Sequence, residues 1–197
     1  MFFFIPAEII MTVPLQAILF LGIIPALILL YIALKGYEGY YKDKTIFLTF
    51  ILGIILGIIA AVIRHIIWYP FIITSIIIFA FFEQLLKTIF LNIGRLQSKK
   101  ETPIYGLTMG LGFGSSFTPF LIIQASTFVG NNLSFLTIIA FGSLGFILFH
   151  GATTTYIGYG IFKGRLTKYL LIAILIQIPF NVFIDFVVYI TVIDALN

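Results

Sequence analysis

The residues of this sequence that could do chemistry are few, and they lie inside long apolar segments. Glu83 stands in Phe-Phe-Glu-Gln-Leu-Leu-Lys, with Gln84 beside it and Lys87 four residues further on. An ionisable group at membrane depth costs about 2.5–3.5 kcal/mol to insert, so each one calls for an explanation. Glu83 and Lys87 share one helix face, so the two side chains could neutralise each other while Lys87 extends to the membrane surface. The alternative is a functional site, which acids inside membranes usually mark.

Further polar residues occupy the middle of three later apolar segments. They are Ser115 and Ser116 in the fourth segment, His150 in the fifth, and Gln177, Asn181 and Asp185 in the sixth. Taken singly, a Ser, Gln or Asn often only hydrogen-bonds a neighbouring helix, for about 1 kcal/mol. A helix rises 1.5 Å per residue, however, and this converts the positions of Ser115, His150, Gln177 and Asn181 to depths within a turn or two of Glu83. The sequence therefore predicts that these side chains line one polar cavity.

Such a cavity could serve two kinds of chemistry. A poised Glu83 can accept a proton from water or protonate a leaving group, and His150 or a neighbouring amide could stabilise an oxyanion. The same groups could instead relay protons or hold a cation in a transporter. A zinc site is disfavoured, because the chain has no cysteine and its other histidine, His65, is expected at the opposite membrane edge. No cofactor and no nucleic-acid partner are expected.

The composition indicates that a membrane-embedded helical bundle positions these residues. Of the 197 residues, 61% are hydrophobic and 9% are charged, and the mean hydropathy is +1.20. An ordinary soluble domain has about 25% charged residues. Because this chain has too little polar material to cover a soluble fold, lipid must be its main solvent. We predict an all-α fold in which residues 1–197 form a single integral membrane domain, with its apolar N-terminus belonging to the first span and not to a signal peptide.

Six apolar segments are long enough to cross a bilayer, which takes about 20 residues. They run from about Ile5 to Leu34, Thr45 to Ile63, Pro70 to Gly94, Pro103 to Val129, Leu133 to Phe162, and Tyr169 to Val192. The first, third and fifth loops carry most of the basic residues, namely Lys35, Lys42, Lys44, Arg95, Lys99, Lys100, Lys163, Arg165 and Lys168. The positive-inside rule places these loops in the cytoplasm and both termini outside. Arg64 is the exception, because it would lie on the outer side.

Two helices carry glycines at four-residue spacing. Gly53 and Gly57 form one such pair in the second segment, and Gly106, Gly110 and Gly114 form a triple in the fourth. Small residues four apart let helices approach closely without lipid between them. The triple is the stronger signal, so we expect the fourth segment to be packed centrally.

The order of the polar motifs resembles that of the glutamate-dependent intramembrane proteases. This superfamily includes the type II CAAX prenyl proteases, the PrsW proteases and the catalytically silent Aph subunit of gamma-secretase. Its four motifs are Glu-Glu followed by Arg or Lys, Phe-x-x-x-His or Glu, a single His, and His-x-x-x-Asn or Asp. The matching positions here are Glu83-Gln84 with Lys87, Phe113-Gly-Ser-Ser-Phe117, His150, and Gln177-Ile-Pro-Phe-Asn181. The similarity extends from about Phe79 to Phe186.

The resemblance implies a water-activating base at Glu83, with His150 and Asn181 as further catalytic residues. Gln84, Phe117 and Gln177 depart from the pattern, because the family has Glu, a polar residue and His there. Ser115 or Ser116 could supply the missing hydrogen-bonding group of the second motif.

Three functions remain open on these residues. The first is a member of this superfamily, either a peptidase or a non-catalytic relative, whose partners are membrane lipids and a transmembrane or lipidated peptide. The second is a small proton- or cation-coupled transporter or channel that uses Glu83, Lys87 and His150. The third is a structural membrane subunit whose polar groups only hold helices together. Low charge and many Ile, Lys and Tyr residues suit the cell membrane of an archaeon or bacterium.

Overall fold

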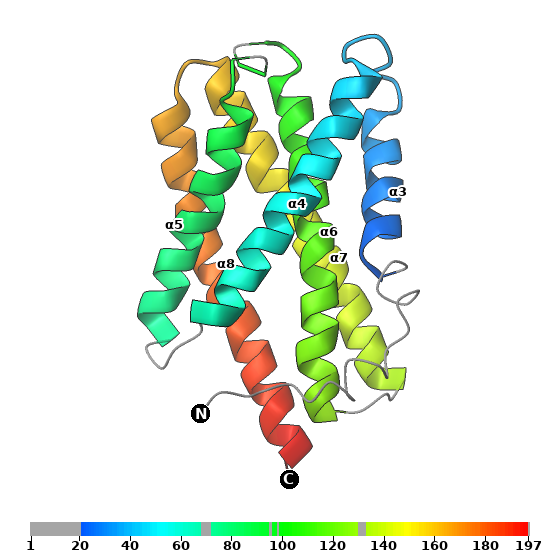
Figure 1. The fold of residues 1–197 in the computed structure, drawn as a ribbon, viewed down its shortest axis with the longest axis vertical. Coiled ribbons are helices and arrows are strands. Elements are labelled where there is room, and N and C mark those ends of the chain that lie inside the picture. The colour runs from blue at the N-terminus through cyan, green and yellow to red at the C-terminus, as the bar shows by residue number, and fades with distance from the viewer. Residues whose placement is uncertain (1–20, 68–71, 95, 98, 130–132, 197) are drawn as a thin grey trace.

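The part of the chain that the structure describes is an all-helical bundle. The computed structural model describes residues 21–67, 72–94, 96–97, 99–129 and 133–196. The helices within them are α3 (Ile23–Leu34), α4 (Asp43–Ile67), α5 (Ile72–Leu91), α6 (Thr102–Val129), α7 (Leu133–Phe162) and α8 (Leu166–Leu196), drawn in Figure 1. Each helix corresponds to one predicted apolar segment, and the predicted ends fall close to the observed ones. Residues 5–20 of the first predicted span, Pro70 and the loop around Asn131 lie outside the described residues.

Three of these helices are long and apolar enough to cross a membrane. Within the described residues, the qualifying stretches are Asp43–Arg64, Ile73–Leu91 and Leu166–Phe186, and the shorter α3 is apolar throughout. Large apolar side chains such as Ile73 and Phe141 lie exposed on the sides of the bundle. A surface of this kind is stable in contact with lipid and unfavourable in water. The prediction of an all-helical fold is thereby confirmed for the described residues, and the three candidate spans support the prediction of a membrane protein.

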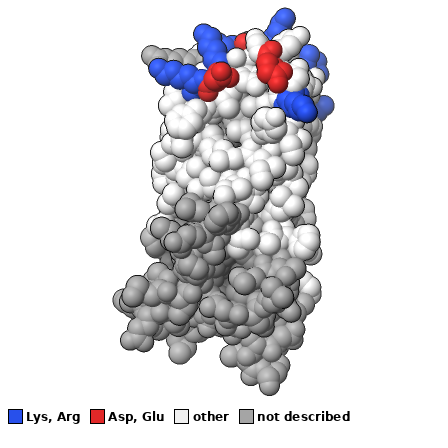
Figure 2. All heavy atoms as spheres, turned by 90° about the vertical axis from the view of Figure 1, so that its right-hand side faces the viewer, with Lys and Arg blue, Asp and Glu red and all other residues white. Residues whose placement is uncertain are grey.

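The loops rich in basic residues gather at one end of the bundle. The α3–α4, α5–α6 and α7–α8 connections all lie at the top of Figure 1, as the charge pattern predicted. Figure 2 shows Lys and Arg side chains crowded at the same end, with an extended uncharged surface below them. The turn after α7 contains Gly164, whose φ of 65° is a left-handed conformation that glycine adopts without steric cost. We call the end of the bundle that carries these three connections its basic end.

Helix α6 is the centre of the bundle, because it contacts all five other helices. Its glycines make this possible. A Cβ atom at Gly106 or Gly110 would collide with a backbone carbonyl of α7, and one at Gly114 would collide with the α7 backbone. Likewise, Gly53 and Gly57 of α4 lie directly against backbone carbonyls of α6. The predictions of glycine-mediated packing and of a central position for this helix are both confirmed.

Helix α5 lies away from this glycine-rich centre and packs mainly against α8. Figure 1 shows the two helices side by side along much of their length, with α4 crossing in front at an angle. Since α5 carries Glu83 and α8 carries Gln177, the contact between these two helices positions the predicted site.

Candidate functional site

Four of the predicted site residues form one hydrogen-bonded network around Gln177. The Gln177 Nε2 donates to Glu83 Oε2 at 2.8 Å and to Asn181 Oδ1 at 2.9 Å. Its Oε1 accepts a hydrogen bond from Gln84 Nε2 at 2.7 Å. All four side chains are at most 1% exposed, so the network is sealed inside the protein. The sequence predicted a shared depth for these residues, and the structure shows that they also face each other.

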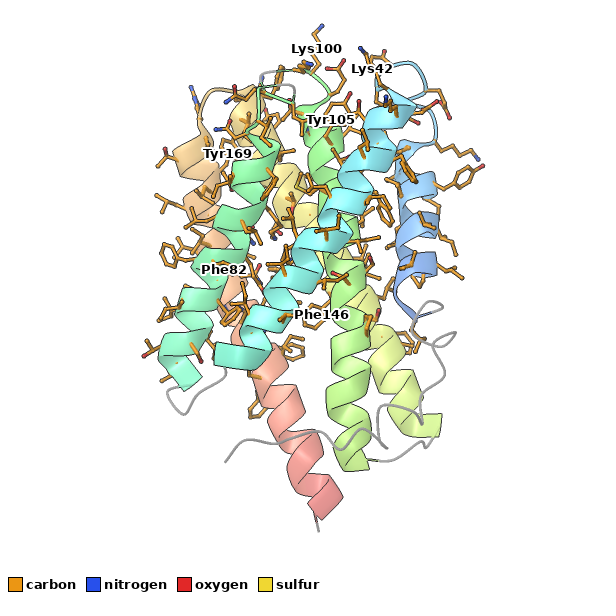
Figure 3. The ribbon with its side chains drawn as sticks, in the orientation of Figure 1. Lys42, Phe82, Lys100, Tyr105, Phe146 and Tyr169 are labelled. Carbon is orange, nitrogen blue, oxygen red and sulfur yellow. The ribbon has the colours of Figure 1, made fainter. Side chains whose placement is uncertain are left out.

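The network depends on helical spacing within α5 and α8. Gln177 and Asn181 are four residues apart, so they lie on the same face of α8 and both point toward α5. Glu83 and Gln84 are adjacent on α5, and both lie on the side that packs against α8. In Figure 3, Phe82, which precedes Glu83, lies at mid-height in the bundle, well below Lys42 and Lys100 at the basic end. The network therefore lies about midway along α5.

Lys87 and His150 form a second pair beside this network. The Lys87 Nζ lies 3.1 Å from His150 Nδ1 and 4.8 Å from the centre of the Phe113 ring. Both residues are completely buried, so Lys87 does not extend to the membrane surface. If Lys87 donates this hydrogen bond, Nδ1 carries no proton and the ring proton of neutral His150 lies on Nε2. No ion pair joins Lys87 to Glu83 among the contacts that the structure describes.

Phenylalanine rings surround the His150 imidazole. The Phe113 and Phe149 rings lie 4.8 Å and 5.6 Å from it, and Phe146 stacks on it at 6.1 Å. The ring of Phe180 on α8 lies 6.4 Å away. This apolar surrounding holds the imidazole in one orientation and keeps bulk water away from it.

Ser115 and Ser116 are buried but do not reach the network. Each hydroxyl donates a hydrogen bond at 2.7 Å to a carbonyl of its own helix, Ser115 to Gly112 and Ser116 to Phe113. Ser116 faces α4, where its hydroxyl lies against Gly57. Neither serine contacts Glu83 in the structure. The Phe117 side chain, which occupies the polar position of the second motif, lies outside the described side chains.

Three polar atoms of the network have no hydrogen-bond partner among the described residues. They are Glu83 Oε1, Gln84 Oε1 and Asn181 Nδ2. Each belongs to a residue that hydrogen-bonds Gln177, so all three atoms are part of the same network. Buried polar groups in proteins are nearly always hydrogen-bonded. These atoms therefore mark positions where a water molecule or a polar group of a ligand can bind.

An ion pair near the other end of the bundle was not predicted as part of the site. The Arg64 Nη2 lies 2.6 Å from Asp185 Oδ1, and its guanidinium lies 5.8 Å from the centre of the Phe79 ring. A small cavity of about 10 Å³ is lined by Arg64, Ser75, Ile76, Phe79 and Asp185. The sequence did contain the signal, because Arg64 is predicted on the outer side and Asp185 follows Asn181 by one helical turn toward that side.

The acidic and histidine side chains of the described residues do not form a metal centre. Among those residues, no three His, Cys, Asp or Glu side chains come together in a way that could hold a metal ion. Comparisons of the sequence with family models and with characterised proteins, and of the fold with solved structures, give no match. The resemblance to the glutamate-dependent proteases therefore rests on the four motifs alone.

Proposed function

We propose that this protein is a membrane-embedded relative of the glutamate-dependent intramembrane proteases and that Glu83 is its general base. The observation that carries the proposal is the state of the Glu83 carboxylate. One oxygen is held by Gln177, while the other is buried and has no hydrogen-bond partner among the residues that the structure describes. A fixed carboxylate with one oxygen available can bind a water molecule and accept its proton. The substrate class is a transmembrane or lipidated peptide segment that reaches the site from the surrounding lipid.

The same arrangement supplies the other requirements of amide hydrolysis. As Glu83 takes a proton from water, the hydroxide adds to the peptide carbonyl and negative charge develops on its oxygen. The Asn181 Nδ2 group is a buried donor without an acceptor among the described residues, and it can stabilise that oxygen. Glu83 then returns the proton to the leaving amine, and an acid and an amine are released. Lys87 adds a positive charge one turn from Glu83, and His150 fixes its position.

The proposal includes a topology and a location. All six helices would span the cell membrane of an archaeon or bacterium, with the basic end in the cytoplasm and both termini outside. The gathering of the three basic loops at one end supports this orientation.

Substituting Glu83 tests the proposal. The protein in proteoliposomes is incubated with quenched fluorescent transmembrane peptides, and Glu83→Gln is compared with the unchanged chain. Loss of a general base lowers the rate by roughly 10²–10⁴-fold. Glu38→Gln, at an exposed loop position, is the matched control and should cleave normally. Cleavage that survives Glu83→Gln would exclude Glu83 as the base, and binding of peptide without cleavage would indicate a non-catalytic relative.

A proton- or cation-coupled transporter is the second candidate, and one observation favours it. Asp185, Glu83, Lys87 and His150 follow one another along the α5–α8 contact and onto α7, with Asn181 and Gln177 between them. A file of ionisable groups and amides of this kind is typical of proton paths in membranes. Proteoliposomes loaded with a pH-sensitive dye distinguish the two functions. A transporter would acidify the lumen down a proton gradient, lose that flux on Glu83→Gln, and cleave no peptide.

A further inference from the structure

The surroundings of the Gln177 network differ between its two ends. Toward the basic end, the next turns of α5, α7 and α8 present Leu91, Ile157 and Ala173, and all three side chains are completely buried. Thr154, one turn from His150, bonds a carbonyl of its own helix and offers no onward polar link. Water approaching from the basic loops would therefore have to cross a packed apolar layer.

Polar groups continue from the network toward the opposite end. On α8, Asn181 and Asp185 follow Gln177 at four-residue steps, so the three lie on one helix face. Each step corresponds to about 6 Å along the axis, at 1.5 Å per residue. The file ends at the Arg64–Asp185 ion pair, whose side chains are 19% and 24% exposed. The polar face of α8 thus leads from the sealed network to the partly exposed part of the bundle.

The small cavity lies beside this ion pair. Its volume of about 10 Å³ is close to the minimum that holds one water molecule. A buried water also needs two to four polar partners, and three of the five lining residues are polar: Arg64, Ser75 and Asp185. Phe79 is one of the lining residues, and it lies one turn before Glu83 on the same face of α5. Asn181 lies one helical turn further into the bundle than Asp185 on α8. Its Nδ2 has no hydrogen-bond partner among the described residues.

We propose that water reaches Glu83 from the end of the bundle opposite the basic loops, through this cavity, and that the Arg64–Asp185 ion pair closes the passage. The ion pair joins the end of α4 to α8 and lies at the cavity, so separating the two side chains widens the opening. Water then passes along Asn181 to the available oxygen of Glu83. The inference rests on the proposed function only in that hydrolysis consumes water at Glu83.

Cysteine labelling measures this access directly, because the chain contains no cysteine of its own. Ser75→Cys places a thiol in the cavity wall, and Ile78→Cys, on an exposed side of the same helix, is the matched lipid-facing control. A membrane-impermeant cationic methanethiosulfonate is applied from either side of oriented proteoliposomes. We expect slow labelling of Ser75→Cys from the end opposite the basic loops, and none of Ile78→Cys. Tyr37→Cys, exposed beside the basic loops, should react only from the other side.

Variants of the ion pair test the closing role. In the Ser75→Cys background, Arg64→Gln or Asp185→Asn should increase the labelling rate several-fold, and the exchanged pair Arg64→Asp with Asp185→Arg should restore it. Labelling of Ser75→Cys from the basic end, or a labelling rate that stays the same in the ion-pair variants, would overturn the inference. The measurement needs no peptide cleavage, so labelling as expected without any peptidase activity would reject the proposed function and leave the water passage standing.

Discussion

The two halves of this bundle are held together in different ways. In the α4–α6–α7 half, glycines bring helix backbones into direct contact, and Thr49 on α4 meets Thr108 on α6 through their hydroxyls. In the α5–α8 half, long polar side chains fill the space between the helices, with Gln177 at the centre. In the first arrangement, the backbones of neighbouring helices touch directly at these glycines. The second leaves polar atoms without hydrogen-bond partners among the described residues, and this is the half that contains the candidate site.

The contrast shows how a very apolar chain can fold uniquely and still carry chemistry. Close backbone packing gives van der Waals contact without requiring polar groups, and in lipid this drives helix association. A rigid α4–α6–α7 half can then support a second interface whose polar groups are retained for another purpose. Substitutions in the two halves should therefore destabilise the protein for different reasons, by steric overlap in the first and by loss of polar contacts in the second. The three substitutions below are ordered by their expected effect on stability.

The largest effect is expected at Gly110. Gly110→Leu would drive a side chain into the His150 carbonyl of α7, and neither backbone can move away. Overpacking costs typically 1–3 kcal/mol where side chains can adjust, so we expect at least the upper end of this range and loss of the folded protein. Thermal unfolding in detergent measures it. Gly145→Leu on α7 is the control, because nothing lies within 4 Å of a Cβ there, and it should unfold at the normal temperature.

A smaller loss is expected at Gln177. Gln177→Leu leaves Glu83 and Gln84 buried without their shared partner, and each unsatisfied polar group costs about 1–3 kcal/mol. A double-mutant cycle with Gln84→Leu separates this from a simple packing change. If the hydrogen bond matters, the double variant should lose less free energy of unfolding than the sum of the two single variants. Strictly additive losses would mean that Gln177 contributes only volume.

The smallest effect is expected at the ion pair. Arg64→Gln removes a partly exposed interaction, and such pairs contribute about 0–1 kcal/mol. The unfolding temperature should therefore hardly change even though water access through the cavity increases. A loss as large as that of Gln177→Leu would show that the pair is a structural tie between α4 and α8, and the two halves would then be less distinct than we describe.

Much of the fold could be predicted because it follows from local composition. Apolar stretches of sufficient length, broken by Lys-rich turns, identify the helices, and the predicted fifth segment matches the bounds of α7. The spacing of Gly106, Gly110 and Gly114 was enough to predict a central helix. The contact between α5 and α8 was beyond sequence reasoning. Helix length and hydropathy say how deep a residue lies but not which way its face turns.

The candidate site shows the same limit. Shared depth correctly brought Glu83, Gln177 and Asn181 to one level, but it also included Ser115 and Ser116, which bond their own helix. A serine hydroxyl can satisfy itself on a carbonyl of the preceding turn, whereas a Gln or Glu side chain must find partners elsewhere. The Arg64–Asp185 pair was missed because each charge was considered within its own helix. A comparison of the predicted depths of the charged residues on different helices would have indicated this pair.

The separation of α5 and α8 along the chain has a consequence for biosynthesis. Gln177 comes 94 residues after Glu83, its hydrogen-bond partner. During synthesis, α5 therefore enters the membrane with Glu83, Gln84 and Lys87 before the helix that satisfies them has been made. A charged residue facing lipid costs about 2.5–3.5 kcal/mol on insertion scales. If α5 inserts as a span, its polar residues therefore lower the stability of the nascent helix in the membrane until α8 emerges and supplies Gln177.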